Sequence, residues 1–300
     1  MDIQGITLAL FASFARKPPV YVDIFNRVSD IRSALLHAKQ ANKTVALVPT
    51  MGALHDGHRS LMQVARDSAD VLVASVFVNP TQFNEADDFN NYPRDIEADR
   101  TILADSGCDM AFTPTVEEIY PEPDHTTYDF GELETRYEGA FRPGHFKGVA
   151  MVVRRLFNII EPDFAFFGEK DFQQVMVIRQ LVRQFKLPVE IVNVPTLRES
   201  DGLAMSSRNV RLSAAERNRA NAIYKALQLA RQLAPSESPE HIRSLAVELL
   251  EQNGLQPEYF DIAYPDTLRP IRDFNGAPHA VALVAARLGN VRLIDNLQLF

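Results

Sequence analysis

The chain has 300 residues, of which 46% are hydrophobic and 23% are charged, and its formal net charge at pH 7 is −8. This composition is typical of a soluble globular protein, and the negative charge argues against a broad nucleic-acid-binding face. The mildly apolar stretch 6–15 is too short to span a bilayer, and the single cysteine, Cys108, cannot form an intramolecular disulfide. We therefore expect a cytoplasmic protein without nucleic-acid or membrane contacts.

Strand-like and helical segments alternate from about residue 22 to residue 196. The expected strands are 44–48, 71–78, 110–113, 164–167 and 189–194, with helices between them. The run 71–78 is apolar at nearly every position, as in a parallel strand that is covered on both faces. The alternation predicts an α/β fold with a doubly wound, Rossmann-like parallel sheet over residues 22–200. We interpret residues 1–21 as an N-terminal extension that precedes this pattern.

The pattern changes after residue 196. A capping-box sequence, Ser213 to Glu216, opens a helix that reaches about residue 233. A second helix starts at Ser238 and ends at Gly254. Strand-like runs then follow at 258–263, 280–286 and 291–296. Helices followed by strands predict a smaller α+β C-terminal domain, residues 201–300.

The most informative segment joins strand 44–48 to the next helix and reads P-T-M-G-A-L-H-D-G-H, ending at His58. The helix N-terminus there offers free N–H groups, and Gly57 lets a phosphate approach the backbone. His55 and His58 add hydrogen-bond donors without permanent charge. Zinc binding is an alternative, but no cysteine cluster or third histidine lies at ligand spacing. The segment indicates a polyphosphate site that is not a P-loop, because G-x-x-x-x-G-K-[ST] does not occur.

Other polar residues follow the ends of neighbouring predicted strands, where open parallel sheets bind ligands. Asn79 and Gln82 are neutral amides suited to hydroxyls and carboxylates, with turn capping as the alternative for Asn79. Lys170 stands at a strand-to-helix turn, where a cation opposes the helix dipole, so we expect an anion beside it. Gln174 lies one helical turn further on and would face the same cavity.

Two loops carry additional basic groups. The run 206–208, Ser-Ser-Arg, offers hydroxyls and a guanidinium for phosphate, with a solvated loop at a domain junction as the alternative. Arg142 and His145 lie in a predicted loop, 142–148, that would clamp phosphates or close over the site. Asp99 is a candidate Mg²⁺ contact, with an ordinary helix face as the alternative, because proteins hold Mg²⁺ largely through phosphates and water.

Taken in order, six motifs resemble those of the pantothenate synthetases: P-T-M-G-A-L-H-D-G-H, V-N-P-T-Q-F, Y-P-R, R-P-G-H-F-x-G-V, F-F-G-E-K-D-F-Q-Q and D-G-L-A-M-S-S-R-N. That family of nucleotidyltransferases is related to class I aminoacyl-tRNA synthetases, with residues 55–58 matching H-x-G-H and 205–208 resembling the K-M-S-K-S loop. The resemblance implies that ATP and pantoate form pantoyl adenylate and pyrophosphate, and that β-alanine then gives pantothenate and AMP. It also implies Mg²⁺ with ATP and a homodimer.

The resemblance assigns roles to residues by position. His55, His58 and Lys170 would be catalytic, with His58 as the proton donor. Gln82 and Gln174 would bind pantoate, with Gln82 also near β-alanine. The ATP site would be lined by Met51, Gly52, Ala53, Leu54, His55, Asp56, Gly57, His58, Gly168, Glu169, Lys170, Asp171, Leu197, Met205, Ser206, Ser207 and Arg208.

Two other hypotheses remain open from the sequence. The first is another adenylyl or cytidylyl transferase on the same scaffold, which substrate screening would separate. The second is a non-catalytic ATP-binding regulator, which would bind ATP without turnover.

Overall fold

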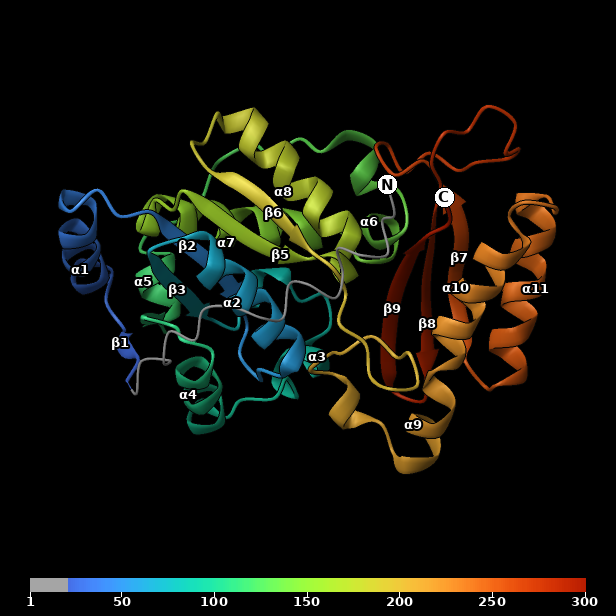
Figure 1. Ribbon diagram of the computed structural model, residues 1–300, viewed down its shortest axis with the longest axis horizontal. Helices are drawn as coiled ribbons and strands as arrows, with labels where there is room; N and C mark the ends of the chain where they lie inside the picture. The colour runs from blue at the N-terminus through green and yellow to red at the C-terminus, as the bar shows by residue number, and fades with distance from the viewer. Residues whose placement is uncertain (1–20) are drawn as a thin grey trace, which may run out of the picture.

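A six-stranded parallel sheet forms the centre of the N-terminal unit in the computed structural model, which describes residues 21–300 (Figure 1). The strands are β1 (Asp23–Phe25), β2 (Val45–Thr50), β3 (Val71–Val76), β4 (Met110–Phe112), β5 (Phe164–Gly168) and β6 (Glu190–Val194). They lie in the order β1-β4-β3-β2-β5-β6, and every neighbouring pair is parallel. The extension predicted over residues 1–21 lies outside the described residues except for Tyr21.

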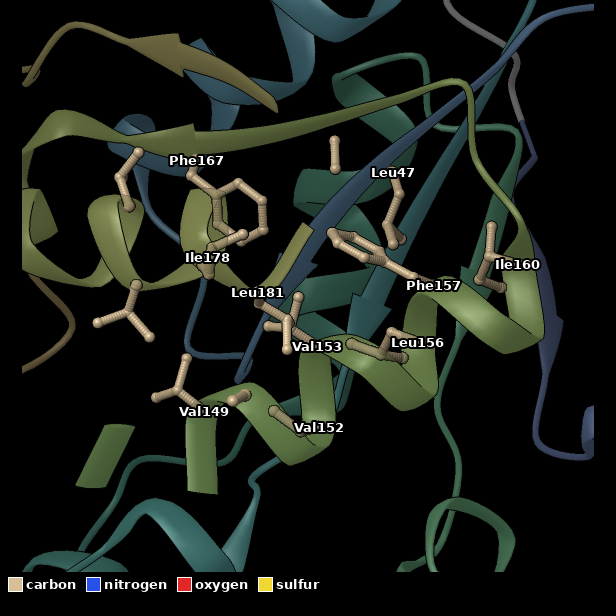
Figure 2. Packing of buried hydrophobic residues seen from close by; sticks show 14 of the residues in the cluster. Leu47, Val149, Val152, Val153, Leu156, Phe157, Ile160, Phe167, Ile178 and Leu181 are labelled. Carbon is tan, nitrogen blue, oxygen red and sulfur yellow. The ribbon is translucent and has the colours of Figure 1, made fainter. Parts of the chain in front are cut away.

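Helices cover both faces of this sheet. The longer ones are α1 (Val28–Gln40), α2 (Asp56–Ser68), α4 (Ile96–Asp105), α7 (His145–Ile160) and α8 (Phe172–Phe185). Successive side chains of a strand point to opposite faces, so Leu47 enters the core formed with α1, α7 and α8, while Val48 enters the core formed with α2 and α4. Figure 2 shows Leu47 and Phe167 from the sheet packed beside Phe157 of α7 and Ile178 of α8. The predicted doubly wound sheet is confirmed.

The strand order places a topological switch between β2 and β5. From β2 the chain builds outward through β3 and β4 on one side, and later through β5 and β6 on the other. Parallel sheets bind ligands in the crevice at the carboxyl ends of strands that flank such a switch. The turn 51–55 follows β2, and the short 3-10 helix η4 (Glu169–Asp171) follows β5. The topology therefore brings the histidine and lysine motifs to one place.

The C-terminal unit is an antiparallel sheet with helices beside it (Figure 1). Its elements are α9 (Ala214–Ala220), α10 (Ala222–Leu233), α11 (Pro239–Gln252), β7 (Gln256–Ala263), β8 (Val281–Leu288) and β9 (Val291–Gln298). These elements share a separate core that begins at Leu203, which confirms a smaller α+β unit. The expected single helix 213–233 divides at Asn221 into α9 and α10. The boundary predicted at residue 201 lies between the end of β6 and this core and stays a prediction.

Several element bounds differ from those expected. The edge strand β1 and the short helices α3 (Ala86–Asn90), α5 (Val116–Ile119) and α6 (Glu138–Phe141) carry no clear periodicity in the sequence. The loop predicted over 142–148 is wrong from His145 onward, because α7 begins there after Gly144, whose φ of +82° suits glycine. Gly148 lies inside α7, where a Cβ would stand 2.2 Å from the Thr81 carbonyl oxygen.

None of the helices described within residues 21–300 combines the length and apolar character that a membrane span requires.

Candidate active site

A cavity of about 220 Å³ opens at the carboxyl ends of β2 and β5 and reaches the segment that leads into the C-terminal unit. Residues from each predicted motif line it, namely Met51, His55, Gly57, His58, Asn79, Gln82, Arg142, His145, Gly168, Lys170, Asp171, Gln174, Leu197, Met205, Ser206, Ser207 and Arg208. Six other predicted residues lie outside its lining: Gly52, Ala53, Leu54, Asp56, Asp99 and Glu169. The fold therefore gathers most of the predicted site residues around one space.

The two histidines of the first motif cap helix α2. The Nδ1 atom of His55 accepts the Gly57 N–H at 3.1 Å, and Nδ1 of His58 accepts the His55 N–H at 3.2 Å. A ring nitrogen that accepts an N–H carries no proton, so each neutral imidazole holds its proton on Nε2. Burial lowers the pKa of His55 to about 4, and burial together with His55 lowers the pKa of His58 to about 3. Both rings are therefore neutral at pH 7 and retain an Nε2–H donor.

Asp99 supports the turn that precedes α2. Its Oδ1 accepts the Leu54 N–H at 2.7 Å, and its Oδ2 accepts the Ala53 N–H at 3.1 Å. Gly52 has a φ of +80°, and a Cβ there would stand 2.7 Å from Oδ2 of Asp99. These contacts account for the buried carboxylate as a support of the turn. The magnesium contact suggested for Asp99 stays a prediction.

Lys170 lies on η4, directly after β5. Its side chain is 17% exposed, and Nζ is 3.2 Å from Oδ1 of Asp171. The turn is held from the C-terminal unit, because Nδ2 of Asn296 on β9 donates to the carbonyl oxygens of Glu169 at 2.8 Å and Lys170 at 3.0 Å. The backbone that carries Lys170 is thus held by an interaction between residues 126 positions apart.

An amide pair forms another part of the cavity wall. Nδ2 of Asn79 donates to Oε1 of Gln82 at 3.0 Å and to the Gly148 carbonyl at 3.1 Å, while its Oδ1 accepts the Thr81 N–H at 3.3 Å. A backbone carbonyl cannot donate and a backbone N–H cannot accept, so these groups fix the Asn79 amide in one orientation. The Gln82 amide is fixed in turn, with Nε2 beside the Met51 sulfur at 3.0 Å, a weak acceptor. Asn79 is 1% exposed, and its hydrogen bond orients the Gln82 amide.

Arg142 and His145 hold the backbone of the same glutamine. Nδ1 of His145 donates to the Gln82 carbonyl at 2.8 Å, so its Nε2 accepts from Arg142 at 3.1 Å. Burial and the neighbouring Arg142 lower the pKa of His145 to about 3. Nη1 of Arg142 lies 3.7 Å from Oε2 of Glu138. The same carboxylate accepts hydrogen bonds from Nη1 and Nη2 of Arg292 on β9, each at 2.7 Å. The C-terminal sheet therefore also braces the Gln82 side of the cavity.

The loop 205–208 crosses over the turn after β2. The Ser207 hydroxyl donates to the Ala53 carbonyl at 3.0 Å. The Arg208 guanidinium pairs with Asp88 of α3, with Nη2 2.8 Å from Oδ2. The loop thus joins the cavity lining and contacts the first unit at two places.

One wall of the cavity consists of residues for which we predict no role in the site. Val149, Val152, Val153 and Leu156 of α7 line it, as does Tyr92 from the Y-P-R motif. Their spacing in the sequence predicts that they share one face of α7. The sequence does not predict that this face lines the cavity, because that depends on how α7 packs against the sheet. These residues add apolar side chains to a lining that also carries charged ones.

We expect the free energy of unfolding to fall as pH is lowered from 6.5 toward 4. The lowered pKa values of His55, His58 and His145 mean that the unfolded chain takes up protons before the folded chain does. Each histidine then contributes a slope of up to about 1.4 kcal/mol per pH unit, with stability rising as pH rises. His145→Asn should reduce the slope measured by urea unfolding at pH 7.0, 6.0 and 5.0. Identical slopes for the variant and the parent protein would contradict this assignment.

Residues 23–298 match the family model described as pantoate-beta-alanine ligase. The pantothenate synthetase of Porphyromonas gingivalis is 49% identical over 278 residues, which cover 92% of this chain and 99% of that protein. A crystal structure of the pantothenate synthetase of Thermus thermophilus is 44% identical, with a TM-score of 0.87 over 93% of this chain and 100% of that chain. A pantoate-beta-alanine ligase of Francisella tularensis, solved in complex with beta-gamma ATP and beta-alanine, is 34% identical, with a TM-score of 0.79 over 93% of this chain and 98% of that chain. The chain therefore belongs to the pantoate-beta-alanine ligase family.

Proposed function

We propose that the protein condenses pantoate with β-alanine in an ATP-dependent reaction that passes through an enzyme-bound pantoyl adenylate. The observation that carries the proposal is the cavity at the β2–β5 switch, where two neutral histidines and Lys170 share a lining with the Gln82 and Gln174 amides. The Francisella relative bound to an ATP species and β-alanine supports the same substrates here. The products would be pantothenate, AMP and pyrophosphate.

In the first step, a carboxylate oxygen of pantoate attacks the α-phosphorus of ATP. A new phosphorus–oxygen bond forms, the bond to the bridging oxygen of the β-phosphate breaks, and pyrophosphate leaves. Negative charge grows on the phosphate oxygens during this step, so hydrogen-bond donors that are already in place lower the barrier. We assign this role to the Nε2–H groups of His55 and His58, whose Nδ1 atoms cap the N-terminal amides of α2, and to Lys170. At a pKa of about 3, His58 serves better as a hydrogen-bond donor than as a source of a transferred proton.

In the second step, the amine of β-alanine attacks the acyl carbon of the adenylate. The carbon–oxygen bond to the phosphate breaks, AMP leaves, and the new amide nitrogen loses its proton. Retaining the adenylate in a cavity protects the activated acyl group from water. The loop 205–208 over the turn 51–55 helps to enclose that space.

The pantoate end of the cavity combines apolar and amide groups. Pantoate carries two methyl groups on one carbon, and the α7 wall at Val149 and Val152 offers a matching apolar surface. Its hydroxyl and carboxylate oxygens accept hydrogen bonds, which Nε2 of Gln82 and the amide of Gln174 can donate. This arrangement supports pantoate over substrates that lack the methyl groups.

We expect Asn79→Asp to raise the KM for pantoate about tenfold, with a smaller change in the KM for ATP. A carboxylate at this position would face the carbonyl oxygen of Gly148 and Oε1 of Gln82, and the Gln82 amide would have to rotate. Steady-state kinetics with each substrate varied in turn would measure the effect. Asn91→Asp makes the same chemical change at an exposed residue of the same segment and serves as the control. Equal changes in both variants would contradict a role through Gln82.

We also propose Mg²⁺ with ATP, a homodimer and a cytoplasmic location. Within residues 21–300 no group of three or more His, Cys, Asp or Glu side chains is arranged to hold a metal ion. The residues present fit an Mg²⁺ ion that is bound mainly by phosphate oxygens and water, with Asp171 as the acidic side chain in the cavity lining. The motif resemblance supports the dimer, and the unpaired, buried Cys108 fits a reducing compartment.

The test is an analysis of nucleotide products from ATP and Mg²⁺ with pantoate, with β-alanine, and with both. We expect AMP and pyrophosphate to accumulate over many turnovers only when both acids are present. Pyrophosphate release that does not need pantoate would indicate another nucleotidyltransferase. ATP binding without pyrophosphate under any condition would indicate a regulator.

A further inference from the structure

Asp88 of α3 makes a forked contact with an arginine of the nucleotide cavity. Its Oδ2 accepts Nη2 of Arg208 at 2.8 Å, and its Oδ1 accepts Nε of Arg208 at 3.3 Å and Nη1 of Arg211 at 2.8 Å. The side chains of all three residues are about a quarter exposed. Burial opposes the charge on Asp88, but the two arginines outweigh it and lower the pKa of this carboxyl. The carboxylate is therefore ionised at neutral pH and lies between two guanidinium groups.

The carboxylate that contacts Arg208 lies outside the lining of the nucleotide cavity. Arg208 lines both that cavity and an adjoining space of about 400 Å³, whereas Asp88 lines only the adjoining space. The fork occupies Nε and Nη2 and leaves Nη1 of Arg208 free of Asp88. The guanidinium carbon also lies 5.7 Å from the centre of the Tyr92 ring. Asp88 thus holds the Nε and Nη2 edge of the Arg208 guanidinium beside the Tyr92 ring, and Nη1 can still donate to a ligand.

The charges of this cluster favour an anion. Asp88 contributes one negative charge, and Arg208 and Arg211 contribute one positive charge each, so the three together carry a charge of +1. Arg211 thereby offsets the repulsion that an isolated carboxylate would exert on a phosphate. A guanidinium that is already oriented also loses less side-chain freedom when a ligand binds.

We propose that Asp88 is a positioning residue for ATP, which orients Arg208 so that its free donor meets the β- and γ-phosphates. This inference rests on the proposed function, in which ATP occupies the cavity. Asp88 itself does not touch the nucleotide. It acts through Arg208, across 120 residues of sequence.

Calorimetric titration of Asp88→Asn with ATP and with AMP, both with Mg²⁺ and without pantoate, tests the proposal. We expect the Kd for ATP to rise about fivefold to tenfold and the Kd for AMP, which lacks the outer phosphates, to stay within about twofold. Asp87→Asn removes the same charge from the exposed neighbouring residue and should change neither value. An unchanged or lower Kd for ATP in Asp88→Asn would overturn the proposal.

A double-mutant cycle with Arg208→Lys separates positioning from general damage to the fold. Lysine keeps the positive charge but lacks the fork, so Asp88→Asn should weaken ATP binding by less than about twofold in that background. A full fivefold to tenfold loss in both backgrounds would show that Asp88 does not act through Arg208. If the parent protein bound ATP no more tightly than AMP, the proposed function would be overturned along with this inference. If the parent protein bound ATP more tightly than AMP and Asp88→Asn had the same Kd for ATP, only the role of Asp88 would be overturned.

Discussion

His58→Ala should lower the rate of pantoyl adenylate formation by about a hundredfold or more while the protein remains folded. The substitution removes an Nε2–H donor from the cavity at the N-terminus of α2, where we place the charge that develops on the phosphate. It also removes the acceptor for the His55 N–H, so a small loss of stability should accompany the kinetic effect. Rapid-quench measurement of adenylate and AMP in a single turnover would isolate the chemical step.

A matched control for His58 is the exposed histidine of α1. His37→Ala should keep the rate of the parent protein, because His37 lies outside the cavity lining. Urea unfolding of both variants would show whether the fold is retained. A His58→Ala rate within about threefold of the parent rate would remove His58 from the account.

Lys170→Ala should reduce kcat by about a hundredfold or more, with a smaller rise in the KM for ATP. Lys170 lies on η4 and lines the same cavity as His55 and His58 at the capped end of α2. A cation that meets the growing charge of the transition state contributes more to kcat than to the binding of ground-state ATP. Steady-state kinetics with ATP varied at saturating pantoate and β-alanine would separate the two parameters.

Lys147 offers the corresponding control for Lys170. It lies in the first turn of α7, is exposed and does not line the cavity, so Lys147→Ala should change kcat by less than about twofold. If Lys170→Ala raised the KM for ATP strongly and left kcat unchanged, Lys170 would only bind ATP. Its assigned role in the transition state would then be wrong.

The sequence predicts those parts of the site that depend on local chemistry. The glycine and histidines after β2 indicate a helix N-terminus, and α2 does begin there. The expectation that its N–H groups are free is wrong for His55 and Gly57, because the two imidazoles accept them. The positions of Asn79 and Lys170 after strand ends indicate one shared edge of the sheet, because parallel strands end on the same side. These inferences need only the period of the strands and the chemistry of the side chains.

The supports of the site could not be predicted in this way. Asn296 holds the Lys170 turn, and Arg292 reaches the Gln82 side of the cavity through Glu138, from a strand near the end of the chain. The position of β9 against the N-terminal unit is set by tertiary packing, and no local sequence pattern predicts it. The start of α7 at His145 differs from the predicted loop for a related reason. Glycine is typical of loops, whereas Gly148 lies in a helix, where a larger residue would collide with Thr81.

The measurement that tests the adenylate most directly is the transfer of oxygen from pantoate. With pantoate labelled by ¹⁸O in its carboxylate, attack on the α-phosphorus followed by cleavage of the acyl carbon–oxygen bond leaves one labelled oxygen in AMP. We expect mass spectrometry to find that oxygen in AMP and none in pyrophosphate. Label in pyrophosphate or orthophosphate, or unlabelled AMP alongside pantothenate, would contradict the pantoyl adenylate mechanism.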